Sequence, residues 1–281
     1  MSVDVERLPA WPEMAVQHLG DLSGGPVLFF GGPYSNLQAT EALLEQARAL
    51  GLGPDRVICT GDVVAYCADA SATTAAVRDF GCPVVRGNCE ESFGAGGIDC
   101  GCGFEEGSAC DLLSQRWFAH AVADLSAEDC AWMARTAPEI RFTFHGRTVS
   151  VIHGGFSASN RFVFETEQAA LAEELALTDA DIVVAGHSGK SFTAGIGGRL
   201  WHNAGVIGMP ANDGDVRTEY SVLDFDRETG SPAFSHHRLV YNHEGAARAM
   251  ADAGLPDGYR EGLLSGYWPN QDILPEVERV G

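Results

Sequence analysis

The sequence predicts an α/β fold, and two features of the chain support this prediction. Short apolar runs rich in β-branched residues alternate with amphipathic stretches of helical period, as in "PVLFF" followed by "NLQATEALLEQARALGL". Several apolar runs end at a glycine beside a polar residue, as in "TGDVV", "VIHGG" and "AGHSG". Buried strands that carry functional groups at their carboxyl ends are typical of α/β proteins.

The alternating pattern occupies the first two thirds of the chain. Apolar, β-branched runs that end at Gly or polar residues predict strands, and these lie at 26–30, 55–62, 82–88, 148–155 and 180–188. Amphipathic stretches between the first of these runs predict helices at 36–52 and 71–81.

The remainder of the chain has a different pattern, which predicts a mostly antiparallel block followed by two short helices. The expected strands lie at 191–197, 199–208, 219–226 and 233–240, and the helices lie within 242–269. Because no repeat or linker interrupts the sequence, we expect one domain over 1–281. It would carry an N-terminal extension at 1–24, a Gly/Cys-rich insertion at 90–113 and a C-terminal helical tail at 243–281.

Composition and charge narrow the class of protein. The chain has 281 residues and is 45% hydrophobic, which is enough to bury a substantial core. Its formal net charge of −21 favours a surface that repels nucleic acid and anionic membranes. No apolar run is long enough for a membrane span, and the start "MSVDVERLPAWPEM" does not resemble a signal peptide. We therefore expect a cytoplasmic protein that binds neither nucleic acid nor membranes.

Four of the predicted strands are followed by side chains that commonly bind metal ions. These are Asp62 in "TGDVV", Asn88 in "RGNCE", His153 in "VIHGG" and His187 in "AGHSG". A single histidine after a strand is more often structural than a ligand, but four such groups at successive strand ends would converge on one edge of the sheet. One carboxylate, one amide oxygen and two imidazoles suit one divalent or trivalent transition metal ion, namely Zn, Fe or Mn.

The order of these loops resembles that of the calcineurin-like metallophosphoesterase family. The resemblance covers roughly residues 25–240 and is carried by the phrases "GDVVAY", "VRGNCE", "VIHGG", "AGHS" and "HNAGVIGMPANDGDVRTEYSVLD". It implies a four-layer αββα sandwich of two mixed sheets flanked by helices. It also implies hydrolysis of phosphate mono- or diesters by metal-activated water, with two metal ions at the sheet edge.

The sequence departs from the family pattern at the ligands of one metal. The family's first loop reads Asp-x-His-Gly-Asn and its last loop reads Gly-His-x-His. In "FFGGPYSNLQA" and "GHSG" those ligand positions are taken by Gly32, Tyr34 and Gly189. All three losses fall on the first metal, while the ligands of the second metal remain. We therefore expect an atypical member of the family with a single metal ion.

Other side chains are candidates to replace the missing ligands of the first metal and the family's catalytic His. Tyr34 either fills the vacated space, binds a ferric ion as phenolate, or donates a hydrogen bond to phosphate. Cys89 stands where the family has a catalytic His, so Tyr34 and Cys89 are the candidate catalytic residues. Asn36 aligns with the Asn of the family's first loop and, with Arg86, is a candidate substrate contact, although the Arg86 side chain could equally point away.

The insertion at 90–113 contains an unusual group of cysteines. Cys89, Cys100, Cys102 and Cys110 follow no standard zinc or iron–sulfur spacing. Three interpretations remain open: free thiols in a compact loop, a second metal site formed by these four residues, or a redox pair.

The leading functional hypothesis is a metal-dependent phosphoesterase with weak or unusual activity on a small phosphorylated substrate. The alternatives are a pseudo-phosphatase that binds a metal or phosphorylated ligand without turnover, and a metalloenzyme that uses the cysteines. The segment "GYWPNQ" near the end offers aromatic side chains either for a dimer contact or for anchoring to the core. Nothing else in the sequence indicates an oligomeric state.

Overall fold

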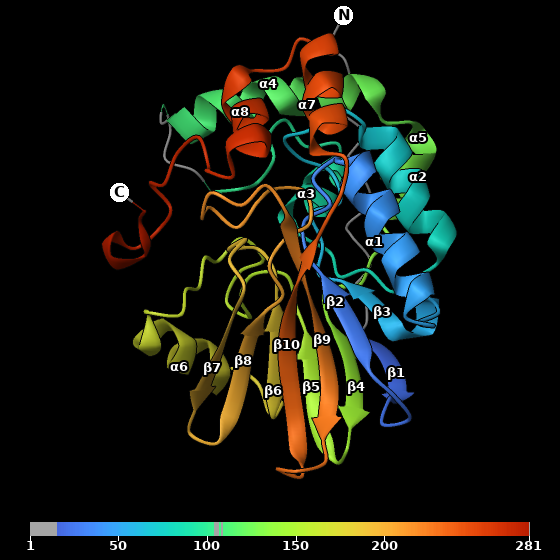
Figure 1. Ribbon diagram of the computed structural model, residues 1–281, viewed down its shortest axis with the longest axis vertical. Helices are drawn as coiled ribbons and strands as arrows, with labels where there is room; N and C mark the ends of the chain where they lie inside the picture. Colours follow the sequence, from blue (N-terminus) through green and yellow to red (C-terminus); the bar gives the residue numbers. More distant parts are fainter. Residues whose placement is uncertain (1–15, 104–106, 108, 281) are drawn as a thin grey trace, which may run out of the picture.

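The computed structural model describes residues 16–103, 107 and 109–280. It contains two mixed β-sheets packed face to face, with helices over both outer faces (Figure 1). The predicted four-layer αββα sandwich is therefore confirmed.

The larger sheet has six strands. Their order across the sheet is β1 (Gln17–Asp21), β4 (Ile140–Phe144), β5 (Arg147–Val151), β6 (Ile182–Ala185), β8 (Arg199–Asn203) and β7 (Phe192–Ile196). Strands β5, β6 and β8 run parallel, whereas β4 and β7 run antiparallel to their neighbours β5 and β8.

The smaller sheet has four strands. Their order is β10 (Ser231–Leu239), β9 (Thr218–Asp226), β2 (Val27–Phe30) and β3 (Val57–Cys59). Strands β2 and β3 are parallel, and β9 pairs antiparallel with both β2 and β10. The predicted antiparallel block is thus divided between the two sheets.

Helices complete the outer layers. They are α1 (Leu37–Ala49), α2 (Ala70–Phe80), α3 (Asn88–Ala95), α4 (Ala109–Asp124), α5 (Ala127–Met133), α6 (Gln168–Ala176), α7 (His243–Asp252) and α8 (Asp257–Ser265), with short 3-10 turns at Pro54–Arg56 and Glu276–Glu278. Most of the helices gather on the side of the smaller sheet and over one end of the sandwich, while α6 covers the larger sheet (Figure 1).

Strand β2 shows how the layers are built. Side chains of a strand point alternately to opposite faces. Accordingly Phe29 packs between the sheets, where its ring lies 6.4 Å from that of Phe142. Leu28 and Phe30 point the other way into the cluster formed with the helices. All four β2 residues are fully buried, which explains the continuous apolar run in the sequence.

Three sequence-based expectations need correction. Residues 17–21 fall in the expected N-terminal extension but form β1, which pairs parallel with β4. Residues 82–88 make only isolated bridges at Val84 and Val85 instead of a strand, because Pro83 has no N–H to donate to a ladder. The expected insertion at 90–113 is partly helical, since α3 extends to Ala95 before Gly96 ends it at φ +67°.

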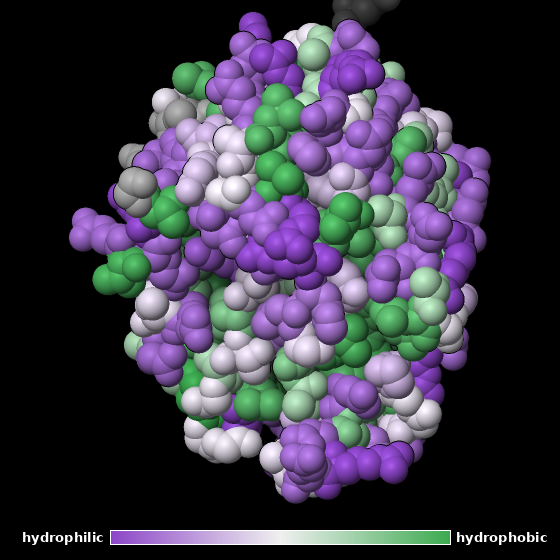
Figure 2. All heavy atoms as spheres, in the orientation of Figure 1, coloured by the Kyte–Doolittle hydropathy of each residue, from purple (hydrophilic) through white to green (hydrophobic). Residues whose placement is uncertain are grey.

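The surface carries mixed side chains. Figure 2 shows hydrophilic side chains over most of one face, with apolar residues in small separate areas. None of the helices in the described part of the chain combines the length and apolar character needed to cross a bilayer.

Candidate metal centre

The four predicted metal ligands meet beside the first turn of α3, which lies over one end of the sandwich in Figure 1. Asp62 follows β3 of the smaller sheet, whereas His153 and His187 follow the parallel strands β5 and β6 of the larger sheet. Asn88 is the first residue of α3. All four side chains are buried, with exposed fractions of 2–7%. The two sheets therefore deliver their strand ends to one shared, enclosed site.

His153 lies at the centre of this group. Its Nδ1 is 2.6 Å from the carbonyl oxygen of Thr60. Because a carbonyl oxygen can only accept, Nδ1 must carry the proton, and Nε2 of the neutral ring is then an acceptor. Yet Nε2 faces three further lone-pair atoms: His187 Nδ1 at 3.0 Å, Asn88 Oδ1 at 3.1 Å and Asp62 Oδ2 at 3.2 Å.

Such a convergence of lone-pair atoms can be satisfied by a metal ion or by a proton on one of the rings. The candidate ligand atoms of Asp62, His153 and His187 all lie within 4.8 Å of one another, and Asn88 Oδ1 adds a fourth donor. Two nitrogen and two oxygen donors match the ligand preferences of zinc and neighbouring transition metals. The residues present therefore fit a single metal ion.

The amide of Asn88 is held in the orientation that a metal ligand needs. Its Nδ2 donates to the carbonyl oxygen of Cys100 at 2.9 Å and lies 3.6 Å from Cys89 Sγ and 3.5 Å from Cys102 Sγ. Since the nitrogen is occupied on that side, Oδ1 must face His153 and the centre of the site. The Gly/Cys-rich loop does not bind the metal itself, but its hydrogen bond fixes the orientation of the metal ligand Asn88.

Glu90 is a supporting residue to which the sequence analysis gave no role. Its carboxylate is fully buried and accepts three backbone N–H bonds, from Asp62 and Val63 at 2.8 Å and from Gly87 at 2.9 Å. It therefore ties the loop of Asp62 to the loop of Asn88. The signal in the sequence is the spacing Gly87-x-x-Glu90, which allows the Glu90 half of a capping box, because the carboxylate accepts from the N-cap N–H while glycine has no side chain to form the other half.

Close packing around these loops explains two glycines. A Cβ on Gly87 would lie 2.5 Å from Asp62 Oδ1, and a Cβ on Gly61 would lie 2.8 Å from His153 Nδ1. Asp62 itself has φ +56°, a conformation that non-glycine residues rarely adopt. The backbone is therefore shaped to bring Asp62 and His153 together, at some conformational cost.

The charges in the site are strongly coupled. Burial alone would raise the pKa of Asp62, but the adjacent His153 outweighs it and holds that pKa far below its ordinary value. Burial alone would lower the pKa of His153, but Asp62 raises it to about 9. Burial and the charge of Asp62 raise the pKa of Glu90 to about 7, and burial lowers the pKa of His187. Without a metal ion, the positive charge among these acceptors is thus a proton on His153.

These shifts predict that the metal-free protein loses stability as the pH rises from about 5 to about 9. The pKa values of Glu90 and His153 are raised from their ordinary 4.5 and 6.5, so both groups keep protons in the folded state that the unfolded chain has released. One pKa unit corresponds to about 1.4 kcal/mol. The lowered pKa of His187 offsets part of the loss below about pH 6.5, so the net loss is on the order of a few kcal/mol. Thermal unfolding in the presence of a chelator, at each pH, measures it.

A bound metal ion should remove most of this pH dependence, because it replaces the proton on His153. The same unfolding series with one equivalent of Mn²⁺ is the control. A chelated protein whose unfolding temperature rises between pH 5 and pH 9 would contradict the assignment of these charges.

Tyr34 occupies the place of one missing ligand. A Cβ on Gly32 would lie 2.4–2.8 Å from ring atoms of Tyr34, so the phenol ring stands where the side chain of an Asp at position 32 would go. The ring is buried and makes an edge contact with Tyr66 at 4.7 Å. Burial and the charge of Asp62 raise the pKa of Tyr34 well above its ordinary value. Tyr34 is therefore a neutral phenol that fills the part of the vacated space next to Gly32.

Trp268 covers the position of another missing metal ligand, at Gly189. Two ring carbons of Trp268 lie 3.5 Å from the position of a Cβ on Gly189, where the family's last loop has its second His. The indole Nε1 donates to the Pro210 carbonyl at 2.7 Å, and the Trp268 backbone N–H donates to Asn212 Oδ1 at 2.8 Å. The "GYWPNQ" segment thus anchors the C-terminal tail to the core, over the half of the site that lacks ligands.

The structure gives Asn36 and Arg86 other partners. Asn36 is fully buried; its Oδ1 accepts from Ala39 N at the start of α1, and its Nδ2 donates to the Gly208 carbonyl. Arg86 lies 3.8 Å from Glu91 and lines a separate cavity of about 260 Å³ that His153 also lines. Neither side chain reaches the cavity that adjoins Asp62 and His187.

Cys89 contacts two of the metal ligands without facing the adjoining cavity. Its backbone N–H donates to Asp62 Oδ1 at 3.2 Å, and its thiol lies against the amide of Asn88. Burial, followed by the charges of Asp62 and Glu90, raises the pKa of Cys89 well above its ordinary value, so the thiol stays protonated. It does not line the cavity beside the metal ligands, which argues against its expected role toward a leaving group.

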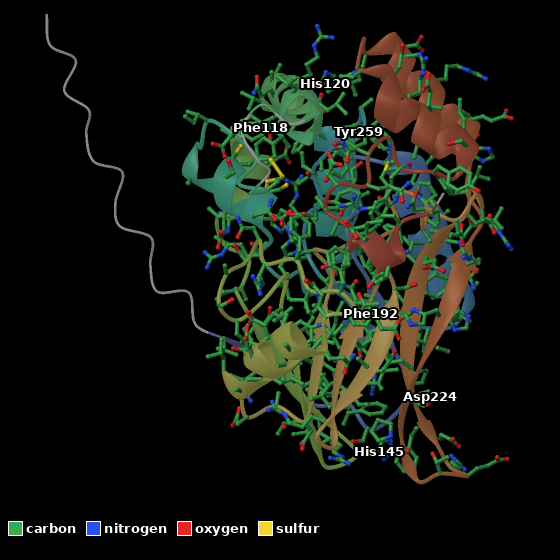
Figure 3. All side chains as sticks on the ribbon, turned by 90° about the vertical axis from the view of Figure 1, so that its left-hand side faces the viewer. Phe118, His120, His145, Phe192, Asp224 and Tyr259 are labelled. Atoms are coloured by element: carbon green, nitrogen blue, oxygen red, sulfur yellow. A yellow bond between two sulfur atoms is a disulfide. The ribbon has the colours of Figure 1, made fainter. Side chains whose placement is uncertain are left out.

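The cysteine segment does not form a second metal site, which was one of the three interpretations left open by the sequence. Cys100 and Cys102 are joined by a disulfide, visible as a yellow bond in Figure 3, so neither offers a thiolate to an ion. Cys89 remains a free thiol, and the side chain of Cys110 lies outside the described residues. The redox-pair interpretation is the one that agrees with this bond.

We therefore expect the double variant Cys100→Ser/Cys102→Ser to bind as many metal equivalents per chain as the natural protein. Its sulfurs are not ligands, although the looser loop should weaken metal binding through Asn88. Elemental analysis of both proteins, purified identically, measures this. The variant Cys130→Ser, which alters a free cysteine away from the ligands, is the control. If the double variant lost one metal equivalent and the control did not, the cysteines would have to bind a second metal ion after all.

Comparison with known proteins identifies a family match and two similar structures. The model of the calcineurin-like phosphoesterase superfamily domain matches residues 14–228. A metallophosphoesterase from Sphaerobacter thermophilus is similar in structure, with 20% identity, a TM-score of 0.62, and coverage of 86% of this chain and 98% of that one. A hypothetical protein from Pyrococcus horikoshii OT3 is also similar, with 12% identity, a TM-score of 0.65, and coverage of 86% and 99%.

Among curated proteins, no significant match was found. The two similar structures share the fold, and the family match covers most of the sequence, including all four converging ligands. The chain belongs to the calcineurin-like phosphoesterase superfamily.

Proposed function

We propose that this protein is a phosphoesterase that works with one metal ion, held by Asp62, Asn88, His153 and His187. The observation that carries the proposal is the convergence of three lone-pair atoms, from Asp62, Asn88 and His187, on His153 Nε2 within 3.2 Å in a buried site. When bound, a transition metal ion supplies positive charge to phosphoryl oxygens and makes water more acidic.

The protein's own residues hold and orient this site. The Thr60 carbonyl fixes the ring of His153, the Cys100 carbonyl fixes the amide of Asn88, and Glu90 joins the two loops that carry Asp62 and Asn88. Such supporting contacts keep ligands within the narrow geometry that catalysis needs. The design is that of a preorganised site and not of a surface cluster of acidic groups.

The remaining half of the site differs from a two-metal centre. Tyr34 and Trp268 occupy the positions beside Gly32 and Gly189, and no Lys or Arg is among the described residues that line the adjoining cavity. A phosphate would therefore find its positive charge on the metal side alone. The neutral Tyr34 hydroxyl is a candidate donor to the phosphoryl group. We infer slow hydrolysis of small phosphate esters, because one metal cannot clamp both the attacking and leaving oxygens.

The loss of the ligands of one metal also favours a second candidate function, which is binding of a phosphorylated ligand without turnover. The site retains the ligands that hold a metal but has lost those that a two-metal mechanism uses. The two candidates differ only in whether the ester bond is cleaved, so one assay separates them.

The test uses p-nitrophenyl phosphate and bis(p-nitrophenyl) phosphate with protein loaded with Mn²⁺, Fe²⁺ or Zn²⁺. We expect slow release of nitrophenol that stops on chelation and is absent from His187→Asn. Metal-dependent protection against thermal unfolding by a phosphonate, without hydrolysis of either ester, would support the binding function instead. Hydrolysis that persists in the chelated protein and in His187→Asn would contradict both.

A further inference from the structure

An aromatic cavity adjoins the candidate metal centre. It has a volume of about 60 Å³ and is bounded on one side by Asp62 and His187. Its other walls are mostly apolar, and the main contributors are Tyr34, Tyr66, Phe162, Val206, Met209 and Trp268. Tyr259 of α8, labelled in Figure 3, also lines it, so the C-terminal helices help to close it.

This cavity lies in the half of the site that has lost its metal ligands. Gly189 and Tyr34 both line it, and both stand at positions where the resemblance places ligands of the first metal. Rings from distant parts of the chain meet there: Tyr34 contacts Tyr66 at 4.7 Å, and Tyr66 contacts Tyr259 at 4.3 Å. An ionic compartment has thus been replaced by an aromatic one.

The walls decide what can enter. An apolar group that leaves water for such a cavity gains about 25 cal/mol per Å² of buried area. A hydroxyl or a charged group would lose its water partners, and apart from the metal side the lining offers only Ser188, Asn270 and the hydroxyl ends of its tyrosines to replace them. Because ring and aliphatic carbons form most of the walls, the cavity favours apolar groups.

We propose that this aromatic cavity binds the apolar group esterified to the phosphate, so that the substrate is a small phosphoester of an apolar alcohol. The proposal rests on the proposed function, because it needs the phosphate on the metal side next to Asp62 and His187. Its size limits the group. A closed cavity that holds benzene measures about 150 Å³, so this one encloses a short alkyl group and only part of a ring.

The test is binding of two phosphonates to the metal-loaded protein, measured by titration calorimetry. Propylphosphonate and 2-hydroxyethylphosphonate have equal numbers of heavy atoms and differ in a methyl group against a hydroxyl. Their P–C bond is not an ester, so hydrolysis does not disturb the measurement. We expect propylphosphonate to bind about tenfold more tightly.

Two variants connect this preference to the cavity. Val206→Thr keeps the shape of a buried wall residue and adds a hydroxyl, and Trp268→Ala removes the ring over Gly189. Both should reduce the ratio of the two affinities to about threefold or less, and the ratio is insensitive to any general loss of stability. Val240→Thr, at an exposed position, is the matched control and should keep the natural ratio.

The outcomes separate the two proposals. A tenfold preference that falls in both cavity variants supports the inference. Equal affinity, or tighter binding of 2-hydroxyethylphosphonate, would overturn the inference and leave the metal-bound phosphate intact. If neither phosphonate binds to protein shown to carry metal, the proposed function fails and the inference fails with it.

Discussion

Replacing His153 by asparagine is expected to abolish metal binding and any phosphoesterase activity. His153 Nε2 lies within 3.2 Å of the donor atoms of Asp62, Asn88 and His187, so its loss removes the centre of the ligand group. Changes around metal sites that leave all ligands in place already cost 10–100-fold in affinity. Loss of a ligand should therefore cost at least about 100-fold, measured by competition with a chromophoric chelator.

His145→Asn is the matched control for this experiment. His145 lies at the end of the molecule opposite to Tyr259 and the site (Figure 3), and its φ of +48° is one that asparagine tolerates. The control should bind metal as the natural protein does. Undiminished metal affinity in His153→Asn would contradict the proposed ligand set.

Replacing Glu90 by glutamine should destabilise the metal-loaded protein by about 2–3 kcal/mol at pH 8. The Glu90 carboxylate accepts three buried backbone N–H groups, whereas a glutamine amide presents a donor to at least one of them. Each buried donor left without an acceptor costs about 1–3 kcal/mol. Chemical denaturation of both proteins gives the difference in unfolding free energy.

The same substitution should also weaken metal binding, because Glu90 holds the loops of Asp62 and Asn88 together. Glu45→Gln, at an exposed position on α1, makes the same chemical change without the buried contacts and is the control. If Glu90→Gln matched that control in both stability and metal affinity, Glu90 would not be the residue that joins the two loops.

The metal ligands could be predicted because each follows directly after a buried strand. His153 and His187 follow parallel neighbouring strands of one sheet and meet at its edge as expected. Asp62 converges with them too, but it comes from the other sheet, so the expectation of a single sheet edge was wrong. Asn88 was predicted on the same argument although its preceding strand is only a pair of bridges at Val84 and Val85. That prediction therefore depends on the position of Asn88 after an apolar run, and not on a regular hydrogen-bonded strand before it.

Other parts of the site depend on contacts that sequence spacing does not show. Trp268 lies 79 residues after Gly189 in the sequence, and only the path of the C-terminal tail brings its ring there. Glu90 acts on backbone N–H groups, which leave no side-chain pattern to read. Strand β1 is mostly exposed and has no apolar alternation, so its pairing with β4 was not predictable from composition.

One metal ion is expected in the half of the site held by Asp62, Asn88, His153 and His187, and aromatic side chains surround the cavity in the other half. Elemental analysis of the protein, purified without chelators or affinity metals, measures how many metal ions each chain holds. We expect one equivalent of a transition metal per chain, and none in His153→Asn. Two equivalents, with one retained in His153→Asn, would show that the vacated half still binds metal, and no metal even after reconstitution would contradict the metal centre altogether.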